Sequence, residues 1–313
     1  NAGGNVSTGT ALTLIGSLAG DALTDCDFNT AVGFSSLSDD TRGSKTTAIG
    51  YQALATQNFT TATDTFNTAV GFQAGKAVTT GTSNTFLGGR SGQATTTGFN
   101  NTGLGKDAMY SNTVGLYNVA VGEGALYTNV DGSNSVAVGR LALYTQDPAT
   151  ATDMYNIGVG YGAGQSITTG IRNTIVGGLS ADSITTGQYN SVLGFGTLTN
   201  ETSGSASTAV GYLALSAQNT QATNYNTAVG YEAGKSVTTG VQNTLIGGLA
   251  GDAITDADFN TAVGYQALTT NQLGSKNVAV GFNSLSGMNP DSAANTFNTA
   301  VGHAAGEVIT TGT

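Results

Sequence analysis

The chain repeats one short phrase from end to end, and this repetition constrains its fold more than any other feature. The clearest copy is Asn67-Thr68-Ala69-Val70-Gly71. Successive copies lie 17 residues apart, except for three steps of 21 and one of 19. Periods this short are typical of solenoids and fibres, in which each unit stacks on the next. The copies end at seventeen glycines, namely Gly16, Gly33, Gly50, Gly71, Gly88, Gly105, Gly122, Gly139, Gly160, Gly177, Gly194, Gly211, Gly230, Gly247, Gly264, Gly281 and Gly302.

The residues before these glycines predict a β-strand that is apolar on both faces. The residue directly before the glycine is Val, Ile or Leu in every copy, and the one before that is apolar or small. Neighbouring residues of a strand point to opposite faces. We therefore assign the residue before the glycine, such as Val229, to the interior, and expect other copies of the chain to cover the remaining face. The predicted repeat core comprises Val32, Gly33, Val70, Gly71, Val121, Gly122, Val159, Gly160, Val229, Gly230, Val263, Gly264, Val301 and Gly302.

The second half of the repeat predicts a further strand and a turn. Four residues after the glycine stands an apolar residue such as Leu54, replaced in other copies by a small one such as Gly75. We interpret this position as a second short strand, and the alternation of leucine and glycine as a packing surface of changing width. A turn such as Thr79-Thr80-Gly81 follows, in which the glycine is expected to adopt positive φ. Asparagine four residues before the repeating glycine, as at Asn84, predicts an amide ladder between rungs.

These patterns together predict an all-β parallel β-solenoid with about 17 residues per rung, because no stretch shows sustained helical periodicity. We expect one repetitive segment, residues 1–313, of a longer fibre. Its longer steps define blocks of roughly 1–62, 63–151, 152–221, 222–293 and 294–313. The segments expected to bulge outward as loops are 55–65, 144–154, 216–224 and 286–296.

Composition excludes several classes of partner. The chain has 19 Asp and Glu against 9 Lys and Arg and no basic stripe, so we expect it to repel nucleic acid. No apolar run approaches membrane-spanning length, so we expect no membrane insertion by this segment. Cys26 is the sole cysteine, and residues 13–37 recur at 244–268 with Ala257 in its place. A small buried or turn residue is therefore favoured over a reactive thiol.

Candidate chemistry is sparse. His303, the sole histidine, replaces the Tyr or Phe that usually follows the repeating glycine, which favours a surface or packing residue over a metal ligand. No acid–base or nucleophilic constellation is evident, so we expect neither enzyme activity nor a cofactor. One duplicated group of carboxylates is a weak calcium candidate, although ordinary turn chemistry is favoured. Its members are Asp21, Asp25, Asp27, Asp252, Asp256 and Asp258.

Aromatic residues recur five positions before the repeating glycine, in roughly alternate rungs. We interpret them as filling space between rungs, with stacking on sugars as the alternative if they are exposed. They are Phe28, Phe66, Tyr117, Tyr155, Tyr189, Tyr225, Phe259 and Phe297.

The repeat resembles known adhesive fibres. The phrases Gly50-Tyr51-Gln52-Ala53-Leu54 and Gly264-Tyr265-Gln266-Ala267-Leu268 are similar to the head repeats of trimeric autotransporter adhesins. They are even more similar to repeats of phage and bacterial tail-fibre-like proteins. This resemblance covers essentially the whole chain. It implies a homotrimer of left-handed parallel β-rolls, located outside the cell on a bacterial surface or a phage virion, that attaches to host cells or surfaces.

Three hypotheses of function remain. The first is a non-enzymatic structural fibre, the shaft or head of an adhesin or tail fibre, whose partners are its own copies and a host-surface receptor. The second is a glycan-binding module displayed on the solenoid. The third is a self-assembling extracellular filament or an ice-binding solenoid, weakened because the threonines cluster at turns.

Overall fold

The computed structural model describes residues 1–312, which are all β and contain no helix. The chain consists of two compact units, Asn1–Tyr155 and the part from Asn156 onward. Each unit is a parallel β-solenoid, in which every rung contributes a three-residue strand that ends directly before a repeating glycine. The predicted fold class is confirmed in this form.

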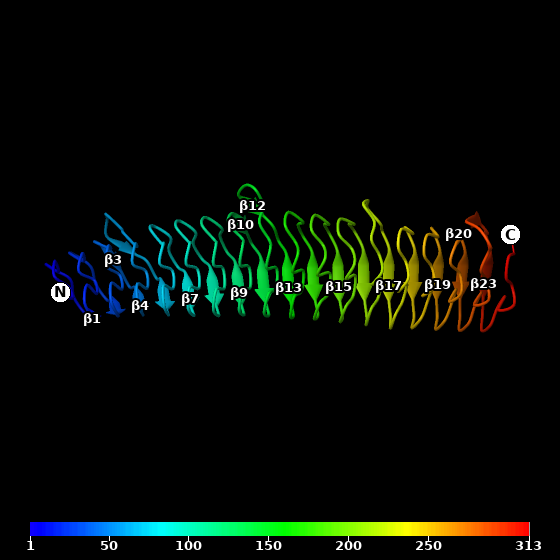
Figure 1. Ribbon diagram of the computed structural model, residues 1–313, viewed down its shortest axis with the longest axis horizontal. Coiled ribbons are helices and arrows are strands. Elements are labelled where there is room, and N and C mark those ends of the chain that lie inside the picture. Colours follow the sequence, from blue (N-terminus) through cyan, green and yellow to red (C-terminus); the bar gives the residue numbers. More distant parts are fainter. Residues whose placement is uncertain (313) are drawn as a thin grey trace. The chain divides into compact units, whose positions relative to one another are not determined.

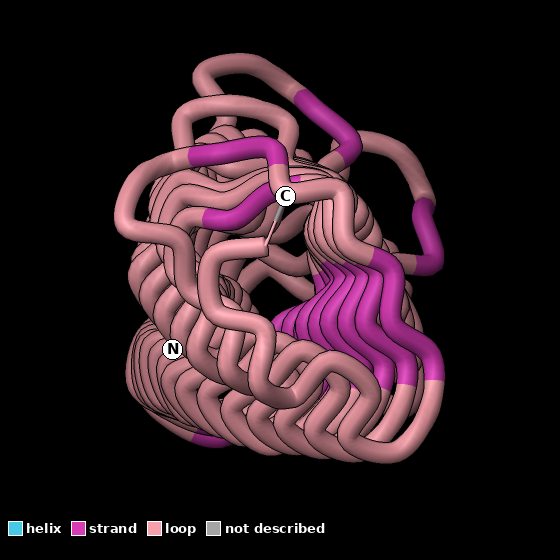
Figure 2. The backbone as a smooth tube through the Cα atoms, turned by 90° about the vertical axis from the view of Figure 1, so that its right-hand side faces the viewer, coloured by secondary structure: helices cyan, strands magenta, loops and turns pink. Residues whose placement is uncertain are grey.

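The strands of each unit pair in parallel and in sequence order, with equivalent residues opposite one another, as Thr68 is to Thr85. Figure 1 shows this succession, and Figure 2 shows the strands on one wall of the coil with turns and loops on the others. The first unit contains β1 (Thr13–Ile15), β2 (Thr30–Val32), β4 (Thr47–Ile49), β6 (Thr68–Val70), β7 (Thr85–Leu87), β8 (Thr102–Leu104), β9 (Val119–Val121) and β11 (Val136–Val138). The second contains β13 (Ile157–Val159), β14 (Thr174–Val176), β15 (Ser191–Leu193), β16 (Thr208–Val210), β17 (Thr227–Val229), β18 (Thr244–Ile246), β19 (Thr261–Val263), β21 (Val278–Val280) and β23 (Thr299–Val301).

The middle residue of each strand, and not the last, faces the interior. In β17, Ala228 is fully buried while Thr227 and Val229 on either side are partly exposed. The assignment of Val229 to the interior was therefore wrong: the strand alternates as expected, but in the opposite phase. The same correction applies to every valine of the predicted core, because Val32, Val70, Val121, Val159, Val229 and Val263 are partly exposed and Val301 is exposed.

The second apolar position is buried, but it does not lie on a strand. Leu54 and Leu268 are fully inaccessible, yet both lie in turns and adopt φ of 48° and 55°. Positive φ is unusual for leucine, because its Cβ approaches the backbone carbonyl. The predicted second strand is thus replaced by a turn with left-handed residues, and burial of the leucine side chain offsets its backbone cost.

The alternation of leucine and glycine at this position reflects packing inside the coil. In the rung where Leu54 occupies this position, the buried residue three positions later is the polar Gln57. In the rung where the position is Gly75, the buried residue three positions later is the apolar Val78. A Cβ added to Gly92 would lie 2.3 Å from the ring of Phe86, the large interior residue of β7. Each rung thus keeps its interior volume nearly constant, since cores are close-packed. The interpretation of this alternation as a packing surface of changing width was therefore wrong.

Asparagines form the predicted ladder along the interior. Asn84 donates from its backbone N–H to Asn67 Oδ1 at 2.9 Å, and from Nδ2 to the carbonyl of Gly98 at 2.8 Å. Equivalent bonds recur in both units, as from Asn243 to Asn226 Oδ1. Each side chain thus satisfies buried backbone groups of the next rung, which would otherwise remain unpaired.

Glycine is required at the corners because there is no room for a side chain, and not because the backbone adopts positive φ. Gly81 lacks the positive φ that we expected, but a Cβ there would lie 2.3 Å from the carbonyl oxygen of Gly98 in the next rung. Any larger residue would push neighbouring corners apart. Thr239, at an equivalent corner, is exposed.

The longer steps form loops that leave the coil and return to it, as predicted and as Figure 1 shows around β12. In three of these loops, a short strand at the end of the loop pairs in parallel with a short strand of the preceding rung. In the fourth, a single parallel bridge joins Ser205 to Thr223. The three short pairs are β3 (Gly43–Ser44) with β5 (Thr63–Asp64), β10 (Gly132–Ser133) with β12 (Thr152–Asp153), and β20 (Gly274–Ser275) with β22 (Ala294–Asn295).

Buried polar side chains hold the base of these loops. Asp40 is inaccessible to solvent and accepts hydrogen bonds from Gln57 Nε2 at 2.6 Å, the Phe59 amide at 3.0 Å and the Gly43 amide at 3.1 Å. Burial nevertheless raises the pKa of the Asp40 carboxyl, because desolvation of the charge outweighs these bonds. Asn129 occupies the equivalent position in another rung and accepts from Gln146 Nε2 at 3.1 Å.

Asp40→Asn should therefore change how stability depends on pH. A carboxyl whose folded pKa is raised contributes stability that is fully present below its unfolded pKa and is lost as pH rises through the folded pKa. The wild type should gain thermal stability relative to the variant as pH falls from 7 to 4. Paired thermal melts at both pH values measure this difference. An identical difference at both would contradict the assignment of a titrating interior carboxyl.

Candidate functional site

The outer face of the strands is an uncharged surface that runs through the rungs of each unit. We call it the strand face and define it as the residues one and three positions before each repeating glycine. The residue directly before the glycine is always Val, Ile or Leu, and the residue three positions before the glycine is mostly threonine. In β7, for example, Thr85 and Leu87 are exposed on either side of the buried Phe86. Aliphatic side chains are thus presented to solvent at every rung.

Exposed aromatic residues flank this face on the side where each strand begins. The aromatics five positions before the glycine are all exposed, up to 66% for Phe297, so our interpretation of them as filling space between rungs was wrong. They adopt left-handed φ, as Phe66 does at 51°, which turns the side chain outward. Lys276 lies between two of them, with its Nζ 5.9 Å from the Phe259 ring and 5.3 Å from the Phe297 ring. Such contacts favour protonated lysine over the ring face.

On the other side, the residues that follow the repeating glycine form stacked aromatic ladders. The rings of Tyr51 and Phe72 are 5.2 Å apart and nearly parallel, with 9° between their planes. His303 stacks on Phe282 at 5.0 Å, which confirms that it replaces an aromatic packing residue. The ladders are Phe34–Tyr51–Phe72, Phe195–Tyr212–Tyr231 and Tyr265–Phe282–His303.

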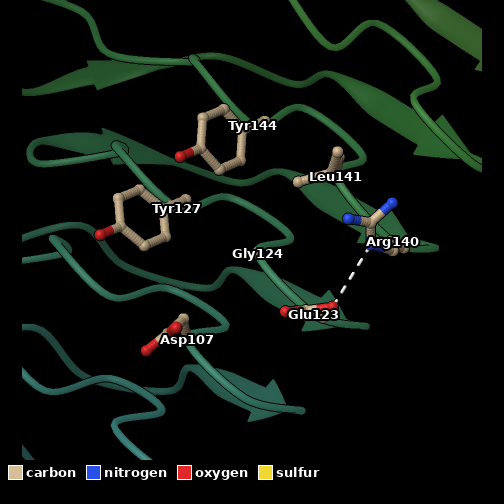
Figure 3. Close-up of a pocket in the computed structure, with 7 residues that line it drawn as sticks. All are labelled: Asp107, Glu123, Gly124, Tyr127, Arg140, Leu141 and Tyr144. Atoms are coloured by element: carbon tan, nitrogen blue, oxygen red, sulfur yellow. Dashed lines mark hydrogen bonds and ion pairs between the residues drawn. The ribbon is translucent and has the colours of Figure 1, made fainter.

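Three consecutive rungs of the first unit depart from this pattern. Directly after the glycine they carry Lys106, Glu123 and Arg140, and four residues later they carry tyrosines. Tyr127 stacks between Tyr110 and Tyr144, with 5.0 Å between ring centroids on each side. We call these six residues with Asp107 the tyrosine patch. Figure 3 shows Tyr127 and Tyr144 on one side of a cavity and Glu123 with Arg140 on the other.

The charges of the tyrosine patch are paired along the rungs. Asp107 Oδ2 accepts from Arg90 Nη2 at 2.7 Å and from Lys106 Nζ at 3.1 Å. Glu123 lies between Lys106 at 3.4 Å and Arg140 at 3.3 Å, and these two cations lower the pKa of its carboxyl. The cavity has a volume of about 250 Å³. Sequence reasoning missed this patch, although its signal was present: two columns change residue type together over three rungs.

The calcium candidates are used in bonds between rungs. Asp27 Oδ1 accepts from both the hydroxyl and the amide of Thr10, which lowers the pKa of Asp27. Asp25 Oδ1 accepts from the hydroxyl of Thr8, and Asp21 accepts from Asn5 through its backbone carbonyl. In the duplicated copy, the partners are Thr269 for Asp252, Thr239 for Asp256 and the Val241 amide for Asp258. Within residues 1–312, no three His, Cys, Asp or Glu side chains gather closely enough to hold a metal ion.

Cys26 is buried, as is Ala257 at the equivalent position, which confirms the expectation of a small buried residue. Burial raises the pKa of the Cys26 thiol, and this keeps it in the protonated form. None of the described residues belongs to a helix long and apolar enough to cross a membrane.

No family model matches the chain, and neither a curated protein nor a solved structure matches it. The strand face and the tyrosine patch therefore carry the functional argument.

Proposed function

We propose that this chain is a non-enzymatic structural fibre that works outside the cell as the shaft or head of an adhesin or tail fibre. In this proposal three copies associate through their strand faces as left-handed β-rolls, and the rod attaches to a host cell or surface. The observation that carries it is the uncharged strand face, which presents an aliphatic side chain at every rung and is flanked by exposed aromatics.

Burial favours association through this face. Contiguous apolar patches beyond a few hundred Å² are rare on soluble monomers and usually mark an interface. Aromatic residues are enriched and charges depleted at the centres of such interfaces. The strand face is free of charges, and exposed Phe and Tyr residues flank it.

The period of the strand face favours the chain's own copies as its occupant. Side chains repeat along it at the strand spacing of about 4.8 Å, and another copy of the chain carries the same spacing. Closed cyclic symmetry would then cover the face over its length without leaving an open, sticky edge. The ladders of asparagine and backbone hydrogen bonds make each rung depend on its neighbours, which suits a stiff rod.

Light scattering of the wild-type chain at micromolar concentration should report about three times its mass of 31.1 kDa. The double variant Val70→Asp and Val229→Asp places one charge on the strand face of each unit. It should shift the protein to monomers with an unchanged circular dichroism spectrum, because both valines point outward.

The matched control carries the same two charges at exposed corners, Thr97→Asp and Thr186→Asp. This variant should retain the wild-type mass. A wild-type chain that is monomeric at micromolar concentration would contradict association, as would equal dissociation of both variants.

A further inference from the structure

The tyrosine patch has the features of a small-molecule site within a single unit. Five residues after the repeating glycine, the other rungs carry a small or polar residue. Three successive rungs carry tyrosine there instead, namely Tyr110, Tyr127 and Tyr144. The two columns have changed together, and they border the same cavity. Packing within the ladder does not require this combination, since Tyr51 and Phe72 stack while the residues that follow them are the uncharged Gln52 and Gln73.

One atom of the patch lacks a partner. Asp107 is only 6% exposed, and while its Oδ2 is paired with Arg90 and Lys106, its buried Oδ1 has no hydrogen-bond partner. Buried carboxylate oxygens normally accept at least one hydrogen bond. Asp107 lines the cavity, but this oxygen is inaccessible to solvent, so the carboxylate that a ligand can reach from the cavity is that of the half-exposed Glu123.

The cavity borders a position without a side chain, where an added Cβ would lie 3.1 Å from Leu141 Cδ2 and 3.4 Å from the ring of Tyr144. Gly124 lies between Asp107 of the rung before and Leu141 of the rung after, at equivalent positions. Its φ of +66° matches that of Leu141 at 58°, so the backbone is the same with or without a side chain. Leucine occupies this position in several other rungs, as at Leu213 and Leu249.

We infer that this cavity binds a neutral saccharide unit. The residues that line it include Glu123, whose carboxylate accepts, Tyr127 and Tyr144, whose hydroxyls both donate and accept, and the apolar Leu141. Vicinal sugar hydroxyls need this mixture, and the C–H face of the ring suits the apolar Leu141. Two cations and two carboxylates balance in the patch, and Arg90 pairs with Asp107 from the rung before, so the charge selects neither a strong anion nor a strong cation.

The volume of the cavity and its position in the fold fit a single sugar ring. The volume of about 250 Å³ lies below the range of about 300–1,000 Å³ typical of drug-sized ligands. The site is built on the turn that follows the strand and uses residues of one chain only. It therefore does not depend on the proposed trimer, although a saccharide site would suit a fibre that attaches to surfaces.

The test is binding of the full chain to a panel of neutral oligosaccharides built on glucose, galactose, mannose and N-acetylglucosamine, with hits measured by calorimetry. We expect at least one to bind, and Gly124→Leu to weaken its binding at least tenfold by filling the cavity. The matched control is Gly162→Leu, at the equivalent position of another rung, where φ is +62° and a Cβ has similar room. It should bind as the wild type does.

Circular dichroism and light scattering of each variant separate loss of the site from loss of fold or association. Should Gly124→Leu misfold, Tyr127→Phe with Tyr144→Phe provides a second test, since it removes both hydroxyls and keeps the ring stack; a tenfold weaker affinity is again expected. Absence of binding to every oligosaccharide, or equal binding by the wild type and the cavity variants, would overturn the inference and leave the fibre proposal untouched.

Discussion

Ala228→Asp should unfold the rungs around β17 and lower the thermal midpoint of the protein by many degrees. Ala228 is fully buried and lies opposite Ala209 and Leu245 in the neighbouring strands. An aspartate there would be surrounded by aliphatic groups and would have no cation to pair with. The effective cost of burying an unpaired charge is several kcal/mol, which is a large part of the stability of a typical domain.

The adjacent Val229→Asp is the control, because it adds the same charge one residue away on the outer face. Its expected effect on the unfolding of a single chain is within about 1 kcal/mol, as for most surface substitutions. Thermal melts followed by circular dichroism compare the two. Equal destabilisation by both would contradict the phase of the strand, and a larger effect of Val229→Asp would reverse it.

Gly88→Ala should be the second severe change. Gly88 adopts φ of +133°, a conformation that residues with a Cβ rarely adopt, and its added Cβ would lie 2.5 Å from the carbonyl oxygen of Gly105. Backbone strain of this kind costs about 1–3 kcal/mol, and moving the next rung to relieve the contact would add to it. We expect a loss of about 3 kcal/mol or more in the free energy of unfolding, measured by denaturant titration.

Gly89→Ala provides a control at the next residue. Gly89 has no positive φ, and an added Cβ would meet nothing within 4 Å. Its effect should lie within about 1 kcal/mol, with mild stabilisation expected because alanine restricts the unfolded chain. Hydrogen exchange should place the damage of Gly88→Ala at β7 and its neighbours, since each rung contacts only the adjacent ones. Loss of protection spread evenly over the chain would argue against this local coupling.

The features that repeat at every rung could be predicted from the sequence. The 17-residue step defined the rung, Asn84 and its equivalents indicated the ladder, and the longer steps marked the loops. Each of these depends on a residue type that serves one purpose wherever it recurs. Burial of Leu54 belongs to the same class, because a leucine at a fixed phase in a narrow coil has an obvious place inside.

The direction of each side chain could not be predicted in the same way. Ala228 and Val229 are both apolar, so alternation allowed either to face inward, and hydrophobicity favoured the valine. The narrow interior instead takes alanine in most rungs, and a residue as large as Phe86 where Gly75 and Gly92 make room. This choice depends on the volume left by the other walls, which no single repeat reveals.

By itself, the sequence determined the period, the β class, the turn positions and the ladder of asparagines, because these are properties of one repeat and its copies. Only the tertiary structure decided which apolar column faces solvent, which leucines adopt left-handed φ, and that Gly124 and Asp107 line one cavity. The physical reason is that these features arise between rungs. Residues 17 apart become neighbours, and their sizes, charges and backbone conformations are satisfied jointly.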